Sequence, residues 1–409
     1  MAFIIKLTCV CCGAEYREGE ALTCGRCGPD EGILDVVFDL PRVGQSLTPS
    51  SLSTRPLTHW RYRELLPLEV DSCRDDLVVG STPLIEAPRL AEALGVGRIR
   101  LKDEGRSASA SFKDRASSIG VARALQEGAD AIACASTGNA ASSLAHCAAV
   151  VGLPCNIFVP KNVPEGKLGQ LLAYGARVFK VLDTYAKAYE LCNEACARFG
   201  WYNRNCAINP YLVEGKKTGG LELAEQCTND PPDWVSVSVG DGCTIAGIAK
   251  GLMQMKSIGL VDWSARVLGV QAVGVAPIAR AFETGRLESS HGGDTYADSI
   301  NCPVPRNWRK AVHGVRESSG AFVTVDDSQI KEAVRMTGRL SGVFAEPAAA
   351  AAVAGVTEAV RLGIIDRRSS VVVMITGNGL KDIAGALGAL GKPHEIKPSL
   401  DEVARIAGS

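Results

Sequence analysis

Short apolar stretches rich in β-branched residues alternate with longer amphipathic stretches rich in alanine and leucine from about residue 82 onward. Glycine or proline marks the joins between them. The pattern predicts strands at 131–135, 155–159, 177–182, 234–239, 267–272 and 371–375, and helices at 112–125, 139–150, 167–173, 186–197 and 245–255. Such alternation is typical of an α/β protein whose sheets are mainly parallel and buried.

Residues 1–40 break this pattern because they are dense in cysteine and in glycine turns. Two Cys-x2-Cys pairs, Cys9 with Cys12 and Cys24 with Cys27, are separated by eleven residues. Each pair can place two thiolates on one metal ion, so together they predict a tetrahedral, structural zinc site in an N-terminal zinc ribbon. The alternative is a group of unrelated reduced cysteines, and Cys11 is a surplus thiol that could join the site.

Composition and charge restrict the classes of partner. The 409 residues carry 44 Lys+Arg against 45 Asp+Glu, a net charge of −1, and no long basic run, which argues against binding to nucleic acid or anionic lipid. The longest uncharged stretch, 131–160, contains polar residues and Pro154 and therefore splits into shorter elements, so we expect no membrane span. Most of the 15 cysteines stand singly in apolar surroundings and no secretory signal is visible, so we expect a cytoplasmic protein with reduced thiols.

One lysine has neighbours that suggest chemistry. Lys113 stands where a loop enters a predicted helix, in the sequence Ser-Phe-Lys-Asp-Arg. Alone, it could be the solvated first turn of a helix. Three other loops follow predicted strands: Ser-Thr-Gly-Asn at 136–139, Gly-Asp-Gly-Cys-Thr at 240–244 and Thr-Gly-Asn-Gly-Leu-Lys-Asp at 376–382.

All three loops lie at the predicted carboxyl ends of strands, where the ligands of parallel α/β sheets collect. Each could be only a tight connection, but together they offer an amine, a phosphate cradle and polar ring partners, which fits pyridoxal phosphate. The Asp241 side chain is expected to turn away from a bound phosphate. Cys243 could be a nucleophile, but a small loop residue is the more economical interpretation.

The chain resembles the threonine synthases, which belong to the fold-type II family of pyridoxal-phosphate enzymes related to the tryptophan synthase β-chain. The matching motifs are the four loops above, Asn209-Pro210-Tyr211, Glu214-Gly215 with Lys217-Thr218, residues 295–300 with Pro305 and Trp308, and the N-terminal zinc ribbon. They span nearly the whole chain in the family's order.

The resemblance implies a set of site residues. Lys113 would be the catalytic lysine and would bind the cofactor covalently. Asn139 and Thr376 would hydrogen-bond the cofactor ring, and its phosphate would lie on Gly240, Asp241, Gly242, Cys243 and Thr244. The residues expected to bind substrate are Ser109, Ser111, Ser136, Thr137, Asn209 and Lys217.

The same resemblance implies the architecture and the reaction. We expect a zinc ribbon at 1–40, a large cofactor-binding α/β domain at 41–110 and 215–409, a small α/β domain at 111–214, and a homodimer. The expected activity converts O-phospho-L-homoserine and water to L-threonine and phosphate, by elimination at Cγ and addition at Cβ.

Two departures from the family leave alternatives open. Ser107-Ala108-Ser109-Ala110 replaces the usual Asn-Pro-Thr-Gly, and Leu212 replaces an arginine that helps to hold the leaving phosphate. Lys216, Lys217, Arg106 or Arg115 could compensate. The alternatives are β-replacement on O-phosphoserine or a related phosphorylated amino acid, dehydration of threonine or serine, and an inert binding module.

Overall fold

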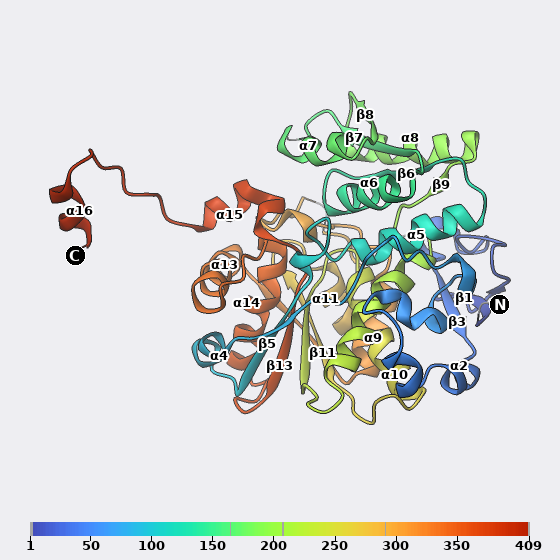
Figure 1. Ribbon diagram of the computed structural model, residues 1–409, viewed down its shortest axis with the longest axis horizontal. Helices are drawn as coiled ribbons and strands as arrows, with labels where there is room; N and C mark the ends of the chain where they lie inside the picture. Colours follow the sequence, from blue (N-terminus) through green and yellow to red (C-terminus); the bar gives the residue numbers. More distant parts are fainter. Residues whose placement is uncertain (1–2, 164, 207, 291, 408–409) are drawn as a thin grey trace.

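The computed structural model describes residues 3–163, 165–206, 208–290 and 292–407, and within these ranges the chain is built around three β-sheets (Figure 1). The predicted α/β class with parallel sheets is confirmed. The predicted strands and helices occur within about two residues of their expected ends. Among the described residues, none of the helices combines the length and the apolar composition that crossing a bilayer requires.

The largest sheet has six strands and carries three of the predicted loops at one edge. Its order is β12 (Ala321–Val325), β11 (Arg266–Ala272), β10 (Trp234–Ser238), β13 (Ser370–Ile375), β5 (Arg98–Asp103) and β4 (Leu84–Glu86). All neighbours are parallel except β4, which pairs antiparallel with β5. The carboxyl ends of β10, β13 and β5 therefore lie together, and the chain leaves them toward residues 240, 376 and 104 respectively.

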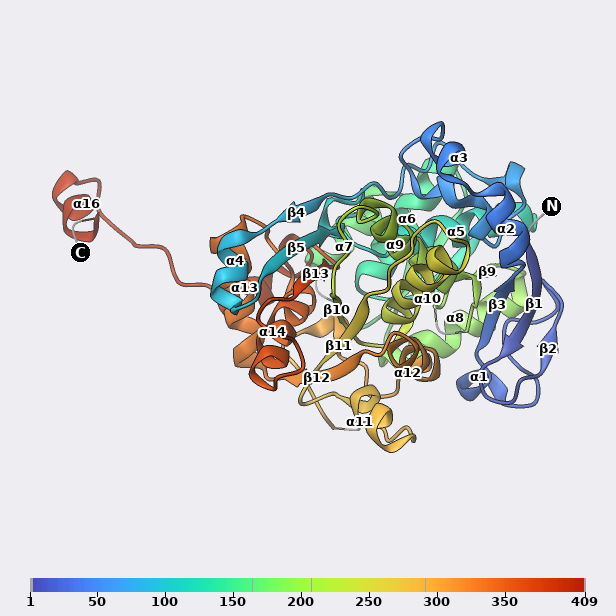
Figure 2. The ribbon, with the colours of Figure 1, turned by 90° about the horizontal axis from the view of Figure 1, so that it is seen from below.

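Helices cover both faces of this sheet (Figure 2). Alternate residues of β13 belong to two different core clusters: Val371, Val373 and Ile375 pack toward one face, and Val372 and Met374 pack toward the other. The first face is covered by α4 (Pro88–Leu94), α13 (Asp327–Ser341) and α14 (Pro347–Arg361). The second is covered by α9 (Tyr211–Gln226), α10 (Cys243–Ser257), α11 (Pro277–Thr284) and α12 (Trp308–Glu317).

The second sheet is wholly parallel and forms a separate layer, at the top of Figure 1. Its order is β8 (Arg177–Val181), β7 (Cys155–Pro160), β6 (Ile132–Ala135) and β9 (Tyr202–Asn203). It carries α6 (Asn139–Val151), α7 (Glu165–Ala173) and α8 (Tyr185–Phe199). Helix α5 (Asp114–Gln126) contacts both α6 and α9 and so joins this layer to the larger one. These strands fall within 111–214, but the domain boundaries themselves stay a prediction.

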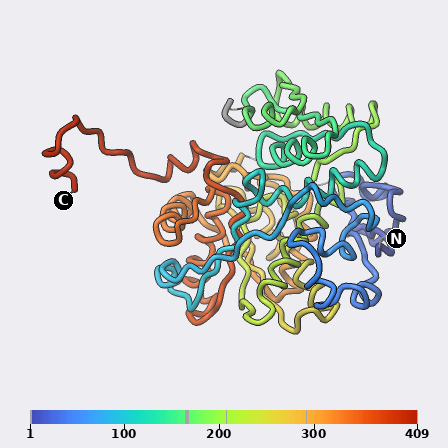
Figure 3. The backbone as a smooth tube through the Cα atoms, in the orientation of Figure 1, coloured from blue at the N-terminus to red at the C-terminus, as the bar shows by residue number. Residues whose placement is uncertain are grey.

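The N-terminal sheet is small and antiparallel, with β2 (Glu15–Tyr16), β1 (Ile4–Cys9) and β3 (Leu34–Phe38) in that order. Shorter elements complete the chain: α1 (Gly28–Glu31), α2 (Leu40–Ser46), α3 (Pro49–Ser53), η1 (His59–Leu65), η2 (Val70–Ser72), η3 (Glu104–Arg106), η4 (Asp298–Ile300), η5 (Gly379–Asp382), α15 (Ile383–Ala389) and α16 (Leu400–Ala407). The backbone trace in Figure 3 shows α16 standing away from the body at the end of an extended segment.

Candidate active site

A cavity of about 500 Å³ opens where the strand ends of the two parallel sheets face each other. Ten of the predicted residues line it: Lys113, Ser136, Thr137, Asn139, Gly240, Asp241, Gly242, Cys243, Thr244 and Thr376. They come from the ends of β6, β10 and β13 and from the start of α5. The structure thus brings the four loops of the sequence motifs into one site.

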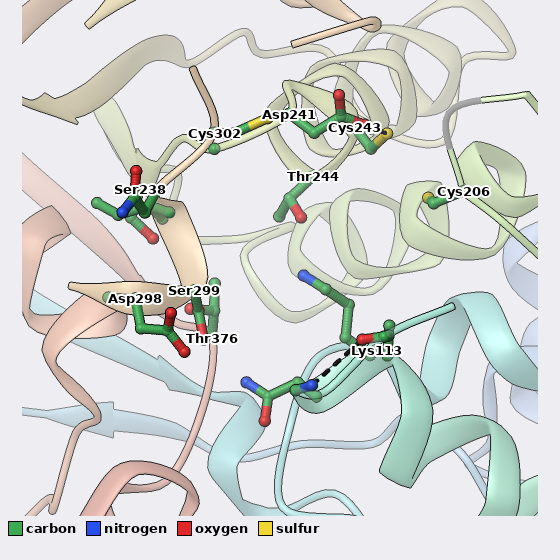
Figure 4. Close-up of a pocket in the computed structure, with 18 of the residues that line it drawn as sticks. Lys113, Cys206, Ser238, Asp241, Cys243, Thr244, Asp298, Ser299, Cys302 and Thr376 are labelled. Atoms are coloured by element: carbon green, nitrogen blue, oxygen red, sulfur yellow. Dashed lines mark hydrogen bonds between the residues drawn. The ribbon is translucent and has the colours of Figure 1, made fainter. Parts of the chain in front are cut away.

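Lys113 is the residue that caps the N-terminus of α5, and its amine is directed toward the 240–244 loop (Figure 4). The loop before it is tied to the large sheet, because the amide of Phe112 donates to the carbonyl of Thr376 at 2.9 Å. Burial, and then the positive charge of Lys216, lower the pKa of Lys113 to about 8. Far more of its amine is therefore neutral near pH 7 than for an ordinary lysine, roughly a tenth, which favours its action as a nucleophile or a base.

The 240–244 loop leads directly into α10 and has the features of an anion cradle. Gly242 has φ +91°, and a Cβ there would lie 2.9 Å from the carbonyl of Asn307, so a larger residue would be strained. The first amides of α10 have no partner within the helix and carry the positive end of its dipole. The carboxylate of Asp241 is engaged by its own surroundings, because Oδ1 accepts from the amide of Arg306 at 2.8 Å and Oδ2 from the thiol of Cys243 at 3.1 Å.

Asn139 faces Glu346, the residue that precedes α14. Its side-chain amide donates to both carboxylate oxygens of Glu346, at 3.1 and 3.0 Å. Burial raises the pKa of Glu346. Gly377 closes this corner, since a Cβ there would lie 2.4 Å from Oε1 of Glu346. The Asn139 carbonyl and amide are thereby fixed in orientation beside the cavity.

Three predicted substrate residues lie outside the cavity lining. The hydroxyl of Ser109 donates to Asp114, and Ser111 is completely buried. The side chain of Asn209 donates to the carbonyl of Asn203 at 2.9 Å and accepts from the amide of Tyr211 at 3.1 Å. These polar groups shape the loops that end in Lys113 and begin α9, and they contribute no surface to the cavity.

Lys217 also lies outside the lining, which is a correction to its expected place in the substrate site. It pairs with Glu214 one turn earlier and lies 3.9 Å above the ring of Phe38 in the N-terminal sheet. Successive residues of a helix point about 100° apart, so Lys216 and Lys217 cannot both face the cavity. It is Lys216 that does.

The cavity also contains residues that the motifs did not indicate, chiefly Arg204 and Cys206. Both follow β9, which is only two residues long and gives no recognisable strand pattern. In the sequence they follow only a short apolar-polar pair, and a pair of this length does not distinguish a strand from a loop. The structure makes them functional candidates because β9 runs parallel to β6 and ends at the same edge.

The four cysteines of the two Cys-x2-Cys pairs come together at the N-terminal sheet, away from this cavity. The sulfur atoms of Cys9, Cys12, Cys24 and Cys27 all lie within 4.8 Å of one another, and those of Cys12 and Cys24 are 3.7 Å apart. A zinc–sulfur distance of about 2.3 Å in a tetrahedron separates the sulfur atoms by about 3.8 Å. The donor set fits zinc, and the exposed Cys11 is not among the four.

Comparison with known proteins decides the family. The model of the family described as pyridoxal-phosphate dependent enzymes matches residues 76–377. This chain belongs to that family. It is an enzyme that uses pyridoxal phosphate, and the resemblance stated above from its motifs is confirmed.

Its curated relatives are threonine synthases. The protein from Methanosarcina acetivorans is 36% identical over 97% of both chains, and that from Methanocaldococcus jannaschii is 34% identical over 97% of this chain and 98% of its own. The Mycobacterium leprae protein is 37% identical over 80% of this chain and 89% of its own.

Solved structures confirm the predicted fold-type II architecture. Threonine deaminase isoform 2 from Solanum lycopersicum has a TM-score of 0.67 at 23% identity, over 76% of this chain and 83% of its own. Maize serine racemase has a TM-score of 0.66 at 22% identity, over 79% of this chain and 96% of its own. At these identities the likeness concerns the fold alone.

Proposed function

We propose that this enzyme converts O-phospho-L-homoserine and water to L-threonine and inorganic phosphate. The observation that carries the proposal is the similarity to threonine synthases along 97% of the chain, with Lys113 and the 240–244 loop in one cavity. The overall change breaks the bond between Cγ and the phosphate oxygen, and the electron pair leaves with phosphate. One Cβ–H bond also breaks, and the hydroxyl of water is added at Cβ. The two protons released, one from Cβ and one from water, go to Cγ and to the departing phosphate, so atoms and charge balance.

The cavity residues fit pyridoxal phosphate. Gly240, Gly242 and the first amides of α10 offer donors for its phosphate, Lys113 offers an amine for its aldehyde, and Asn139 and Thr376 offer polar groups for its ring. Bound there, the cofactor supplies an electron sink that makes protons on neighbouring substrate carbons acidic. Thr376 would offer the ring nitrogen a neutral hydroxyl, which makes this sink more moderate than a carboxylate would.

Lys113 then acts as the proton carrier. Its Nζ is the basic nitrogen beside the reacting atoms, and a pKa of about 8 lets it both accept a proton from Cα and return one at a later carbon. Ser136 and Thr137 lie at the start of α6, where hydroxyls and helix amides suit the substrate α-carboxylate. The neighbouring carboxyl group of Glu346 has a raised pKa and can hold a proton in the cavity.

The test compares two substrates on one protein. Purified holoenzyme is given O-phospho-L-homoserine and O-phospho-L-serine in parallel, and phosphate and amino-acid products are measured. Release of phosphate with threonine from the first substrate is the expected result. Turnover of the second alone, with an added nucleophile, would replace this proposal with β-replacement.

A variant of the lysine completes the test. Lys113→Ala should lose the visible absorbance of the bound cofactor and lower kcat by roughly 10²–10⁴-fold or more. Asn209→Ala is the matched control for a polar residue of the same motifs outside the cavity, and should keep the absorbance. A Lys113→Ala protein with unchanged absorbance and rate would contradict the assignment.

We also infer that the four clustered cysteines hold one structural zinc ion. The mutual distances of their four sulfur atoms, which complete a tetrahedral set, support a closed site. Zinc supplies no step of the reaction here and would stabilise the N-terminal sheet.

A further inference from the structure

Two buried cations line the cavity without a carboxylate partner. The side chains of Arg204 and Lys216 are each 2% exposed. Nε and Nη2 of Arg204 donate to the hydroxyl of Ser117, at 3.3 and 3.0 Å, and Nζ of Lys216 lies 2.6 Å from Sγ of Cys206. Among the side chains that the structure describes, no carboxylate lies within salt-bridge distance of either cation.

Such charges need an anion. Burying a cation is costly unless an opposite charge or several hydrogen bonds compensate it. With Lys113, the cavity lining holds three basic side chains and the three carboxylates of Asp241, Asp298 and Glu346. Asp241 accepts from the backbone amide of Arg306, Glu346 accepts from the side chain of Asn139, and within the described part of the chain none of the three is salt-bridged to Arg204 or Lys216. The described partners of Arg204 and Lys216 are the Ser117 hydroxyl and the Cys206 sulfur, so an anion bound between them would supply the charge partner that each lacks.

The other basic residues that could serve a second phosphate are unsuitable. The guanidinium of Arg115 is completely buried between Glu104 and Glu222, at 2.8 and 3.1 Å. Arg106 is 69% exposed and lies outside the lining, and Lys217 faces the N-terminal sheet.

Leu212 does not replace them. It is completely buried, and its Cδ2 packs toward Gly120 of α5. Arg204 and Lys216 are thus the cations left to recognise a phosphate that is not the cofactor's. They come from different elements, the loop after β9 and the second turn of α9, and both line the cavity, close enough for each charge to act on the other.

We propose that Arg204 and Lys216 form a second anion subsite, which binds the phosphate of the amino-acid substrate. The inference rests on the proposed function and names the residues that take up its leaving group. Before phosphate binds, the sulfur of Cys206 is the partner of Lys216. The neighbouring Cys243 thiol and the charge of Lys216 outweigh burial and keep the pKa of Cys206 well below its usual range. A bound phosphate becomes the partner of Lys216 in place of the Cys206 thiolate.

The first experiment uses this exchange as a readout that needs no turnover. Holoenzyme, with its cofactor phosphate in place, is treated with iodoacetamide with and without inorganic phosphate, and alkylation of the peptide containing Cys206 is followed by mass spectrometry. Phosphate should slow alkylation of Cys206 several-fold and leave the exposed Cys11 unaffected as an internal control. Equal alkylation rates at Cys206 would overturn the proposal.

The second experiment uses variants. Lys216→Met and Arg204→Gln should each raise KM for O-phospho-L-homoserine by roughly 10- to 100-fold and abolish protection by phosphate, because each removes charge-assisted hydrogen bonds. Lys216→Arg should restore most of both, and Arg106→Gln, a cation outside the cavity, should match the native protein. If Lys216→Met weakens cofactor binding and leaves KM unchanged, the cation serves the cofactor phosphate and the proposal is wrong.

The two proposals fail in different ways. If native holoenzyme releases no phosphate from O-phospho-L-homoserine, the proposed function fails, and protection of Cys206 by inorganic phosphate still tests the subsite. If the native enzyme turns over and neither KM nor protection depends on Lys216 and Arg204, only the subsite fails. The first experiment uses native protein, so it decides the matter even where a variant does not fold.

Discussion

Lys113 and Arg115 are two positions apart in one motif, yet the structure gives them opposite roles. Lys113 faces the cavity with a lowered pKa, whereas Arg115 is sealed between two carboxylates in the interior. The sequence motif alone does not separate these roles, because both residues are basic and adjacent to the same helix start. Burial and partners decide which is reactive and which is structural.

At Lys113, cofactor capture should speed up with pH. Only the neutral amine attacks an aldehyde, and burial together with Lys216 places the pKa at about 8. Mixing cofactor-free protein with pyridoxal phosphate between about pH 7 and pH 9 should show a rising rate that levels off above the pKa, followed by visible absorbance. Lys216→Met removes a nearby positive charge and should move the midpoint to higher pH; an unmoved midpoint would contradict the coupling.

At Arg115, truncation should be severely destabilising. Arg115→Met leaves Glu104 buried without its cation and Glu222 paired with Lys102 alone, and should lower the free energy of unfolding by about 3–5 kcal/mol. Arg106→Gln, whose side chain is 69% exposed, should change it by less than about 1 kcal/mol. Urea unfolding of both variants measures the difference, and equal losses would argue against the buried network.

The same network predicts how stability depends on pH. Burial alone would raise the pKa of Glu222, but Arg115 and Lys102 outweigh it and the net pKa is lowered. A lowered folded-state pKa means that the stabilisation is complete above the unfolded value of about 4.3 and is lost as the pH falls toward the folded value. Acid unfolding of the Glu222→Gln variant should therefore depend less steeply on pH below about 4 than that of the native protein.

At the scale of elements, regular periodicity made most of the fold predictable. Strands β6, β7, β8, β10, β11 and β13 and helices α5, α6, α7, α8 and α10 were expected from alternation alone, because each buries one apolar face or is wholly apolar. Helix α9 was not expected, since it is buried almost all round and carries charged residues that pair inside the protein, such as Glu214 with Lys217. Strand β9 was also not predicted, because a strand of two residues is too short to show an alternation of apolar and polar positions.

The residues of the site likewise divide into those that the sequence predicts and those that it does not. Loops with glycine and hydroxyl residues after long strands could be assigned from sequence, whereas Arg204 and Cys206 could not. Three predicted substrate residues, Ser109, Ser111 and Asn209, belong to the same motifs but shape the loops, and a fourth, Lys217, packs against the N-terminal sheet. A motif fixes neighbours along the chain without fixing which way each side chain points.

The contact between α9 and α10 makes a prediction of its own. A Cβ at Gly220 would lie 2.3 Å from the carbonyl of Ile248, so Gly220→Ala must push the two helices apart and should cost about 1–3 kcal/mol. Gly338→Ala is the matched control: this glycine of α13 has nothing within 4 Å of the added carbon, and the change should be neutral or stabilising by up to about 1 kcal/mol. Urea midpoints compare the two, and a neutral Gly220→Ala would show that the helices separate freely.

At the scale of the whole molecule, salt bridges join the N-terminal sheet to the helices that cover the large sheet. Nζ of Lys250 on α10 lies 3.0 Å from Asp35 and 2.7 Å from Glu214, and Lys310 lies 3.0 Å from Asp35. These groups link β3 to three helices of the large sheet. The N-terminal sheet is therefore part of the surroundings of α9 and is not an isolated appendage.

Removal of the metal tests whether the N-terminal sheet depends on zinc for its stability. Native protein should contain about one zinc ion per chain, and chelation should first remove hydrogen-exchange protection from β1 and β3. Cys24→Ser should lower the zinc content, whereas Cys11→Ser, at an exposed thiol outside the cluster, should not. A protected N-terminal sheet in zinc-free protein would refute the metal site.

The adjacency of Lys216 and Lys217 on α9 has a thermodynamic consequence. One of them faces the cavity and the next is held against Phe38 of the N-terminal sheet, so the same turn of helix belongs to both regions. If the ribbon helps to hold that turn, a phosphorylated ligand must bind more tightly to zinc-loaded protein. By reciprocity, it must then raise the equilibrium affinity of the four cysteines for zinc by the same factor. The zinc affinity of the N-terminal ribbon would then differ between protein with an empty cavity and protein with a ligand bound in it.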